Sequence, residues 1–178
     1  MITHLKAEEQ HQHKNGGGWV ANTAIVETSA YIGADAQVYG NARVFGNAQV
    51  SGNAQVYGNA WVFGNAQVSG NAQVYGNAWV YGNAWVYVFG NARVFGNAQV
   101  YGNAWVSGDA WVSSPLYIQG TKHALTNSRH GYISIGCHEN TFEYWQKHYK
   151  AIGRAEGYTT EEIKQYGLFI QIFVKIGR

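Results

Sequence analysis

The sequence of 178 residues has one cysteine, one proline and one methionine, and only 12% of its residues are charged. The single cysteine, Cys137, excludes an internal disulfide framework and favours a reducing compartment. A formal net charge of +2 argues against a dedicated nucleic-acid-binding protein. No apolar run reaches membrane-spanning length, and the first ten residues lack the apolar segment of a signal peptide. We therefore expect a cytoplasmic protein that does not insert into membranes.

Histidine and charge are also scarce in the middle of the chain. No histidine and only five charged residues lie between Lys14 and Lys122. General bases and metal ligands are therefore nearly missing from more than half of the sequence. We expect no metal and no cofactor, and the alternating His11 and His13 near the N-terminus are typical of a solvated polar segment.

A six-residue pattern fills this middle stretch, and VYGNAQ and VFGNAW are two examples of it. Alanine and valine are separated by one variable residue, so both point to one side of a strand while the variable residue points to the other. Glycine and asparagine interrupt the strand every sixth residue, and both residue types favour corners. A fixed short period of this kind predicts a solenoid, in which successive turns bury a continuous core.

A longer period of eighteen residues, or three hexads, is set by the residue after each valine. This residue is tyrosine, phenylalanine and serine in turn: Tyr39, Phe45, Ser51, Tyr57, Phe63 and Ser69. Each turn is therefore predicted to be a triangle whose three sides carry stacked side chains of one kind. At equivalent corners, the amides of Asn41, Asn59 and Asn77 are expected to form a hydrogen-bonded ladder.

The period is broken once, where Val86 and Val88 are only two residues apart. Either a strand has gained two residues or a corner has been lost. We favour the longer strand, with a bulge near Tyr87, because a turn that lacks one corner cannot close its triangle. A neutral duplication explains the break at least as well as a functional role does.

The hexads resemble the hexapeptide-repeat superfamily, and this resemblance covers residues 17–115. It implies a mainly β fold, a left-handed parallel β-helix with three hexads per coil and about five to six coils. It also implies a homotrimer, which would cover the outward aromatic side chains of the rod. Acyltransferases of the superfamily use coil histidines as general bases, and its carbonic anhydrase branch uses them as metal ligands. Because this chain has no histidine in its hexads, we lean against an enzyme.

The composition changes after Pro115, so we place a C-terminal module at residues 116–178, while residues 1–16 are expected to be a flexible tail. The module is predicted to be a small α+β unit with short strands in LYIQG, TKHAL and GYISIG. One helix begins after Thr141, and a capping box of Thr159 and Glu162 begins a second. The apolar segment LFIQIFVKI is assigned to the second helix, buried between subunits or against the rod.

The motifs YISIGC, EYW and EGYTTEEIKQYG resemble the tails of uncharacterised phage and prophage hexapeptide-repeat proteins. This resemblance implies an accessory role and names no reaction. The module also holds singular cations and histidines, which together with an aromatic side chain could bind a small anion. The candidate ligand-binding residues are Lys122, His123, Arg129, His130, His138 and Trp145. Cys137 and His138 are expected to point to opposite faces of a strand, whereas His123 or His130 could pair with Cys137 across the sheet. We favour structural packing of Cys137 and assign no catalytic residue.

Three functions remain open. The favoured one is a non-enzymatic scaffold, a trimeric rod whose C-terminal module mediates assembly and binds a protein partner. The alternative is a phage accessory protein that sequesters a small anionic ligand, such as a nucleotide signal, to block host defence. The third is an acyltransferase-like enzyme, for which His123 is the only imaginable source of the histidine. The rod itself could also offer an aromatic platform for sugars or bases through Trp61, Trp79 and Tyr57.

Overall fold

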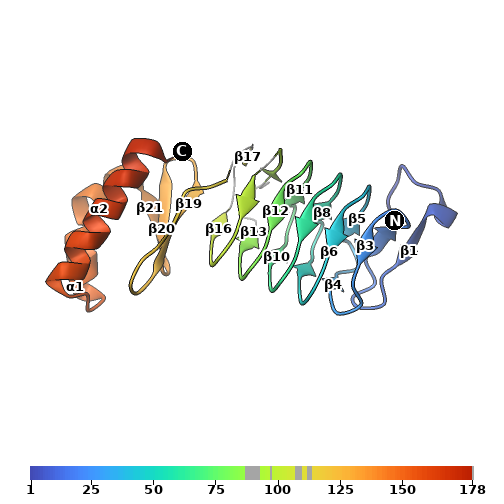
Figure 1. The fold of residues 1–178 in the computed structure, drawn as a ribbon, viewed down its shortest axis with the longest axis horizontal. Coiled ribbons are helices and arrows are strands. Elements are labelled where there is room, and N and C mark those ends of the chain that lie inside the picture. The colour runs from blue at the N-terminus through green and yellow to red at the C-terminus, as the bar shows by residue number, and fades with distance from the viewer. Residues whose placement is uncertain (87–92, 97, 107–109, 112–113, 178) are drawn as a thin grey trace. The chain divides into compact units, whose positions relative to one another are not determined.

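The computed structural model describes residues 1–86, 93–96, 98–106, 110–111 and 114–177. The chain divides into two compact units, Met1–Ser114 and Pro115–Arg178. The first unit is a coil of very short strands, and the second contains a small sheet and two helices (Figure 1). Each unit is described separately below.

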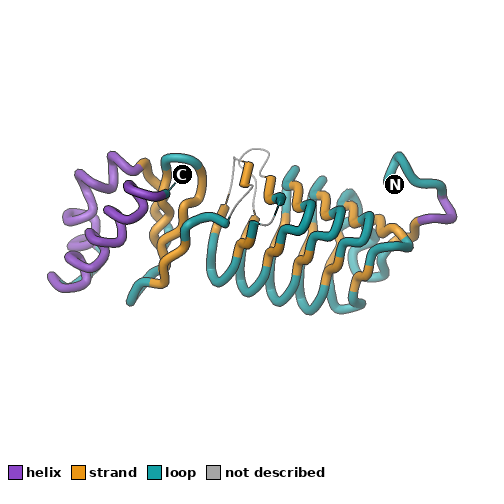
Figure 2. The backbone as a smooth tube through the Cα atoms, turned by 45° about the horizontal axis from the view of Figure 1, so that its top comes forward, coloured by secondary structure: helices purple, strands orange, loops and turns teal. Residues whose placement is uncertain are grey.

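The first unit is a parallel β-solenoid whose three sheets are the sides of the predicted triangle (Figure 2). The tyrosine face is the outer side of β1 (Gln10–Gln12), β2 (Trp19–Ala21), β5 (Gln37–Val38), β8 (Gln55–Val56), β11 (Gln73–Val74), β14 (Arg93–Val94) and β17 (Ala110–Trp111). The tryptophan face belongs to β3 (Ile25–Val26), β6 (Arg43–Val44), β9 (Trp61–Val62), β12 (Trp79–Val80) and β15 (Gln99–Val100). The serine face belongs to β4 (Tyr31–Ile32), β7 (Gln49–Val50), β10 (Gln67–Val68), β13 (Trp85–Val86) and β16 (Trp105–Val106).

Equivalent residues lie above one another in successive turns, which confirms the period of eighteen residues. Val38 pairs with Val56, and Val56 pairs with Val74. The backbone amide of each strand donates to a carbonyl of the next turn at about 2.9 Å, so the ladder is continuous. The alanine and valine of every hexad from Ala36 to Val86 are fully buried, and together they form the core.

Glycine and asparagine have different roles at the corners of the solenoid. Among the described residues, only glycines have positive φ, and Gly52 has a φ of 60°. A methyl group on Gly52 would lie 3.0 Å from both the backbone nitrogen and the carbonyl oxygen of Gly70 in the next turn. The asparagines form the predicted ladder, in which the Asn41 amide donates to Asn59 at 3.5 Å and Asn59 to Asn77 at 3.3 Å. Glycine therefore makes the bend, and asparagine links the bends.

The break in the period removes no side of the triangle. Strands β13, β14 and β15 still fall in three different sheets. Gln73 pairs with Arg93, two residues beyond the spacing that separates Gln55 from Gln73. The two extra residues therefore belong to the segment between β13 and β14. The bulge predicted near Tyr87 lies outside the described residues.

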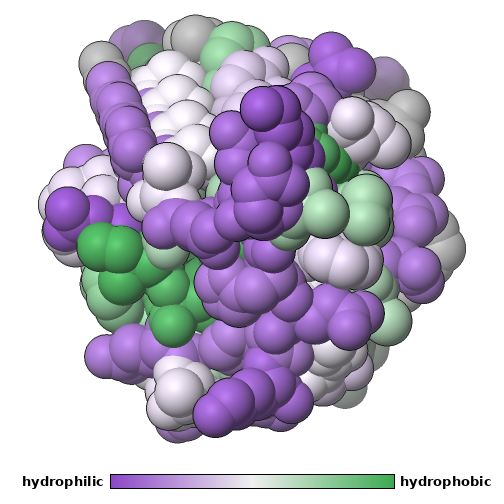
Figure 3. Space-filling view, turned by 90° about the vertical axis from the view of Figure 1, so that its right-hand side faces the viewer, coloured by the Kyte–Doolittle hydropathy of each residue, from purple (hydrophilic) through white to green (hydrophobic). Residues whose placement is uncertain are grey.

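Residues 1–16, predicted as a flexible tail, are folded against the first turn of the solenoid. They contain a short 3₁₀ helix, η1 (Ala7–Glu9), and β1, which pairs antiparallel with β2. Ile2 is fully buried, and the Gln10 side chain accepts a hydrogen bond from Ile2 N at 2.8 Å and donates to Ile2 O at 3.2 Å. This segment covers a free strand edge that would otherwise invite pairing with another chain. Figure 3 shows this end, where hydrophilic residues predominate beside one hydrophobic patch.

The second unit is the predicted α+β module, with four antiparallel strands in place of two or three. The strands are β18 (Tyr117–Gln119), β19 (Ala124–Arg129), β20 (Tyr132–Ile135) and β21 (His138–Thr141), in that order. They are followed by α1 (Phe142–Ala155) and α2 (Thr160–Ile176), which confirms both helices and their threonine caps. The buried core consists of Leu125, Ile133, Ile135, Trp145, Tyr166, Ile170 and Phe173.

The capping box of α2 predicts a contribution to stability that depends on pH. Thr159 N donates to the Glu162 carboxylate at 2.7 Å, and this hydrogen bond, aided by Lys122, holds the pKa of Glu162 below its ordinary value of 4.5. A lowered folded-state pKa means that the stabilisation is complete above the ordinary value and is lost as the pH falls through the lowered one. We expect the Tm of Glu162→Gln to fall less than that of the wild-type protein as the pH is lowered, because the variant lacks this carboxylate. Glu161→Gln, outside the box, should retain it, and equal loss in both variants would contradict the assignment.

Candidate functional site

The tyrosine face carries one continuous column of rings. Tyr39 stacks on Tyr57 at 4.8 Å between ring centroids, Tyr57 on Tyr75 at 4.9 Å, and Tyr75 on Phe95 at 5.0 Å, all within 3° of parallel. The His4 ring closes the N-terminal end of the column edge-on at 4.9 Å from Tyr39. Burial in the column raises the pKa of Tyr39 and Tyr57, and the neighbouring phenol adds to the effect.

The tryptophan face carries two columns side by side. In the first, the Arg43 guanidinium lies 4.8 Å from the centroid of Trp61, and Trp61 stacks on Trp79 at 5.3 Å. The second consists of Phe63, Tyr81 and Tyr101, with centroid distances of 4.9 and 5.7 Å. Trp79 is 39% exposed, so this face keeps a large aromatic surface in water.

The stacking decides how these columns can be used. Tyr57 has a ring on each of its faces, and Trp61 lies between a guanidinium and another indole. A sugar or a base needs a free ring face against which to stack. The ring faces of Tyr57 and Trp61 are therefore taken, and their edges remain for contact, whereas Trp79 stacks on Trp61 and has Gln99 as its register partner in the next turn. The faces of the rod therefore suit packing against another ordered surface better than they suit a ring ligand.

Two of the predicted ligand residues lie at the turn between β18 and β19, where the Lys122 ammonium and the backbone of His123 are hydrogen-bonded. The Lys122 ammonium donates to Gly157 O at 2.6 Å and lies 4.8 Å from the centroid of Tyr158. The backbone nitrogen of His123 donates to the Tyr166 hydroxyl at 2.7 Å, which in turn donates to His123 O at 2.6 Å. Burial, followed by the adjacent Tyr166, raises the pKa of Tyr158. These contacts fasten the turn to α2.

The other predicted residues lie in different places. Arg129, at the opposite end of β19, pairs with Glu139 at 3.0 Å, and His130 is exposed in the following turn. His138 at the start of β21 contacts Glu156 at 2.9 Å. Trp145 is only 3% exposed, and its indole N–H donates to Ile133 O at 2.8 Å. Of these residues, the structure brings His138 and Trp145 into contact, with ring centroids 6.4 Å apart.

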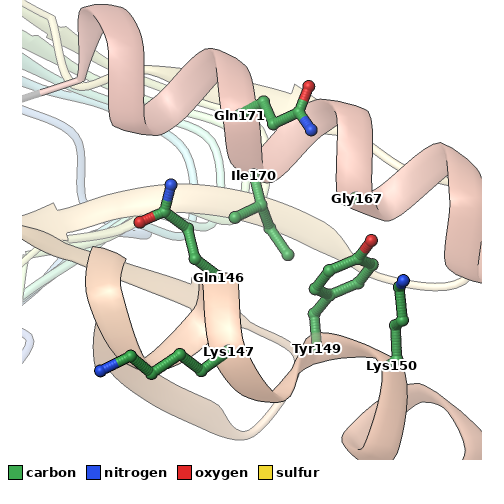
Figure 4. Close-up of a pocket in the computed structure, with 7 residues that line it drawn as sticks. All are labelled: Gln146, Lys147, Tyr149, Lys150, Gly167, Ile170 and Gln171. Atoms are coloured by element: carbon green, nitrogen blue, oxygen red, sulfur yellow. The ribbon is translucent and has the colours of Figure 1, made fainter.

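A hollow of about 310 Å³ between α1 and α2 was missed from the sequence. We call it the helix hollow; it is lined by Gln146, Lys147, Tyr149, Lys150, Gly167, Ile170 and Gln171 (Figure 4). Its α1 residues are spaced three and four apart, which places them on one side of the helix. The spacing of the α1 residues could have indicated one side of the hollow. The α2 residues that line the other side could not be predicted, because they depend on how the two helices pack.

Gly167 shapes the helix hollow, because its missing side chain makes room for Tyr149. A methyl group at Gly167 would lie 2.7 Å from the Tyr149 ring. Glycine inside a helix costs about 1 kcal/mol relative to alanine. Alanine at position 167 would remove this cost, but we expect Gly167→Ala not to stabilise the protein, because the Tyr149 ring must move. In a Tyr149→Ala background, the same change should stabilise the protein by about 1 kcal/mol. Urea unfolding of the four proteins measures the coupling, and equal effects in both backgrounds would show that the ring does not depend on Gly167.

A second hollow, of about 360 Å³, lies on the tryptophan face across the first turns of the solenoid. It is lined by Thr23, Ile25, Asn41, Arg43, Asn59 and Trp61. The residues described by the structure contain no group of three or more His, Cys, Asp or Glu placed to hold a metal. His11 and His13, for example, contact Asn22 and Ala30 O respectively. Over the described residues, no helix is both long and apolar enough to cross a membrane.

The comparisons with known proteins support the solenoid. Segments 36–52, 48–62, 54–70, 72–87 and 98–114 match the sequence model of the YdcK Beta solenoid repeat. The protein is thus a β-solenoid repeat protein, and its hexads are similar to the YdcK repeat. The match leaves out residues 88–97, which begin where the period breaks. No curated protein and no solved structure matches the chain.

Proposed function

We propose that this protein is a non-enzymatic scaffold: a trimeric, left-handed β-solenoid rod that assembles with copies of itself and binds a protein partner through its C-terminal module. The observation that carries the proposal is the repetition of the faces. Successive turns present the same stacked rings and the same amide ladders. A catalytic site needs a singular arrangement of groups, whereas a surface that repeats at the strand spacing is suited to packing over its whole length.

The second helix supports assembly through the C-terminal module. Tyr166, Ile170 and Phe173 bury one side of α2 in the core of the module. On the opposite side, three apolar residues four positions apart form a stripe that is 61%, 41% and 64% exposed: Leu168, Ile172 and Ile176. A helix that is apolar on two sides is typical of a buried position. A subunit interface would supply the second cover.

The alternatives have weaker support. An anion sequestered by the predicted cluster would have to compete with the pairings of Lys122 and Arg129, which already contact Gly157 O and Glu139. An acyltransferase would rest on His123, which lies in a turn that Tyr166 fastens to α2. The accessory role implied by the phage-like motifs agrees with a cytoplasmic scaffold that has no reaction of its own.

The test is the molar mass in solution. We expect light scattering and native mass spectrometry at micromolar concentration to give three times the chain mass. Leu168→Gln with Ile172→Gln should lower the mass to that of a monomer while the circular dichroism stays unchanged, and Lys164→Gln serves as the control on the same helix. A monomeric wild-type protein would contradict the scaffold proposal.

A further inference from the structure

The first turn of the solenoid has three strand edges, and the N-terminal segment covers two of them. β1 pairs with β2 along the first edge. At the second edge, Ile32 of β4 donates its N–H to Asn15 O at 2.9 Å and accepts from Gly18 N at 2.8 Å. The carbonyl of Ala30 beside it contacts the His13 ring at 3.1 Å. The backbone groups of β4 that point away from the solenoid are therefore hydrogen-bonded.

The third edge, that of β3, is open. Among the residues that the structure describes, none forms a hydrogen bond with Ala24 O, Val26 N or Val26 O, which are the groups equivalent to those of β4. The ladder from β3 to β6 uses the neighbouring residues instead, with Ile25 N and Glu27 N each donating to the next turn at 2.9 Å. A strand edge with unpaired N–H and C=O groups is a template for pairing with another chain.

The core side chains of β3 are also incompletely covered. In the two covered strands, the inward residues Val20 and Ile32 are 1% and 0% exposed. The corresponding Ala24 and Val26 of β3 are partly exposed, and the outward Ile25 is 50% exposed. This end of the solenoid carries exposed hydrophobic surface (Figure 3). A strand added at the edge of β3 would therefore bury apolar side chains as well as pair with the backbone.

The register of such a strand follows from the repeat. Within the solenoid, the residue between alanine and valine donates to the alanine carbonyl of the next turn, as Gln37 N does to Ala54 O at 3.0 Å. The residue after the valine donates to the next valine carbonyl, as Tyr39 N does to Val56 O at 3.0 Å. A parallel strand with the pattern Ala-x-Val, placed before β3 in the same register, would pair with all three open groups.

The open edge suits a single strand better than the end of a second solenoid. Figures 1 and 2 show η1 projecting beyond β3 at this end, so another solenoid would meet η1 before it reached β3. The inner strands of a second copy are also unavailable, because each is paired with a strand on both sides. The occupant is therefore an extended segment whose own backbone is not yet paired.

We propose that β3 binds an extended segment of a partner protein, which adds to the sheet as one more parallel strand. The segment carries a small and an aliphatic side chain two residues apart, and these cover Ala24 and Val26. Its backbone donates to Ala24 O and Val26 O and accepts from Val26 N. The site lies in the first unit, outside the exposed stripe of α2, so the proposal does not depend on the assembly proposed above.

The test uses the full chain and the peptide GNAQVYG with blocked ends, which is the sequence of residues 52–58. We expect the backbone amide NMR signal of Val26 to shift, with a Kd of about 1 mM or tighter. The signal of Ile32 should stay in place, because its N–H is already bonded to Asn15 O. A peptide methylated at the tyrosine nitrogen lacks the donor to Val26 O and should bind about fivefold more weakly or worse.

Val26→Pro is the matching variant of the protein. It removes an N–H that no described residue accepts, and an edge strand tolerates proline, so the circular dichroism should be retained while peptide binding weakens about fivefold or more. Val26→Thr keeps the N–H and is the control. Equal binding of the two peptides, shifts centred away from β3, or no binding at about 5 mM peptide would overturn the site. A lower oligomer mass in Val26→Pro would assign the edge to self-association and overturn the partner.

Discussion

Gly52→Ala is expected to destabilise the solenoid by about 3 kcal/mol or more. Two costs add at this corner. An alanine at a φ of 60° pays about 1–2 kcal/mol for the left-handed conformation. In addition, the new methyl group would lie 3.0 Å from two backbone atoms of Gly70, which cannot move without disturbing the next turn. Urea unfolding followed by circular dichroism in the β-sheet region measures the loss.

The matched control is Gly17→Ala in the segment that covers the first turn. Gly17 has a φ of 76°, so the conformational cost is the same, but nothing lies within 4 Å of its added methyl group. We expect a loss of about 1–2 kcal/mol there. The difference between the two variants isolates the close approach of neighbouring turns. Equal losses would show that the turns are not stacked as tightly as the structure has them.

Phe173→Ala is expected to cost about 3–5 kcal/mol in the C-terminal module. Phe173 is fully buried and packs in one cluster with Leu125, Ile133 and Ile170, so its removal leaves a cavity between α2 and the sheet. Hydrogen exchange read by mass spectrometry should show loss of protection in peptides from residues 116–177. Peptides from the solenoid should keep theirs, because this cluster contains no residue of the first unit.

Gln171→Ala, on the exposed side of the same helix, is the control for the cavity. It should change the stability of the module by less than about 0.5 kcal/mol. If Gln171→Ala lost as much hydrogen-exchange protection as Phe173→Ala, the stability of the module would not depend mainly on the buried side of α2.

Periodicity predicted the solenoid well because every turn repeats the same local interactions. The spacing of Tyr39, Tyr57 and Tyr75 was enough to place these rings in one column, and that of the corner asparagines was enough for the ladder. The start of α2 followed from Thr159 and Glu162 alone, since a capping box is a local device. Local chemistry also outweighed the β-branched residues of LFIQIFVKI, which form a helix.

What the sequence did not show depends on contacts between distant residues. The segment HENT is polar and has no alternating pattern, yet it forms β21 because it pairs with β20. The folding of residues 1–16 rests on hydrogen bonds between Gln10 and Ile2. The predicted ligand residues are separated because β19 spans the distance between Lys122 and Arg129, and the helix hollow exists only once α1 and α2 pack together.

The stacking of residues eighteen positions apart is tested most directly by electron paramagnetic resonance on pairs of nitroxide labels. In a Cys137→Ser background, labels introduced at Ser51 and Ser69 report on β7 and β10, which pair in register through Val50 and Val68. Adjacent strands are about 4.8 Å apart, so we predict strong dipolar broadening. Labels at Gln55 and Ser69 are closer in sequence but belong to different sheets, and they should give a weaker effect. Absence of broadening in the first pair, or stronger broadening in the second, would contradict the triangular solenoid.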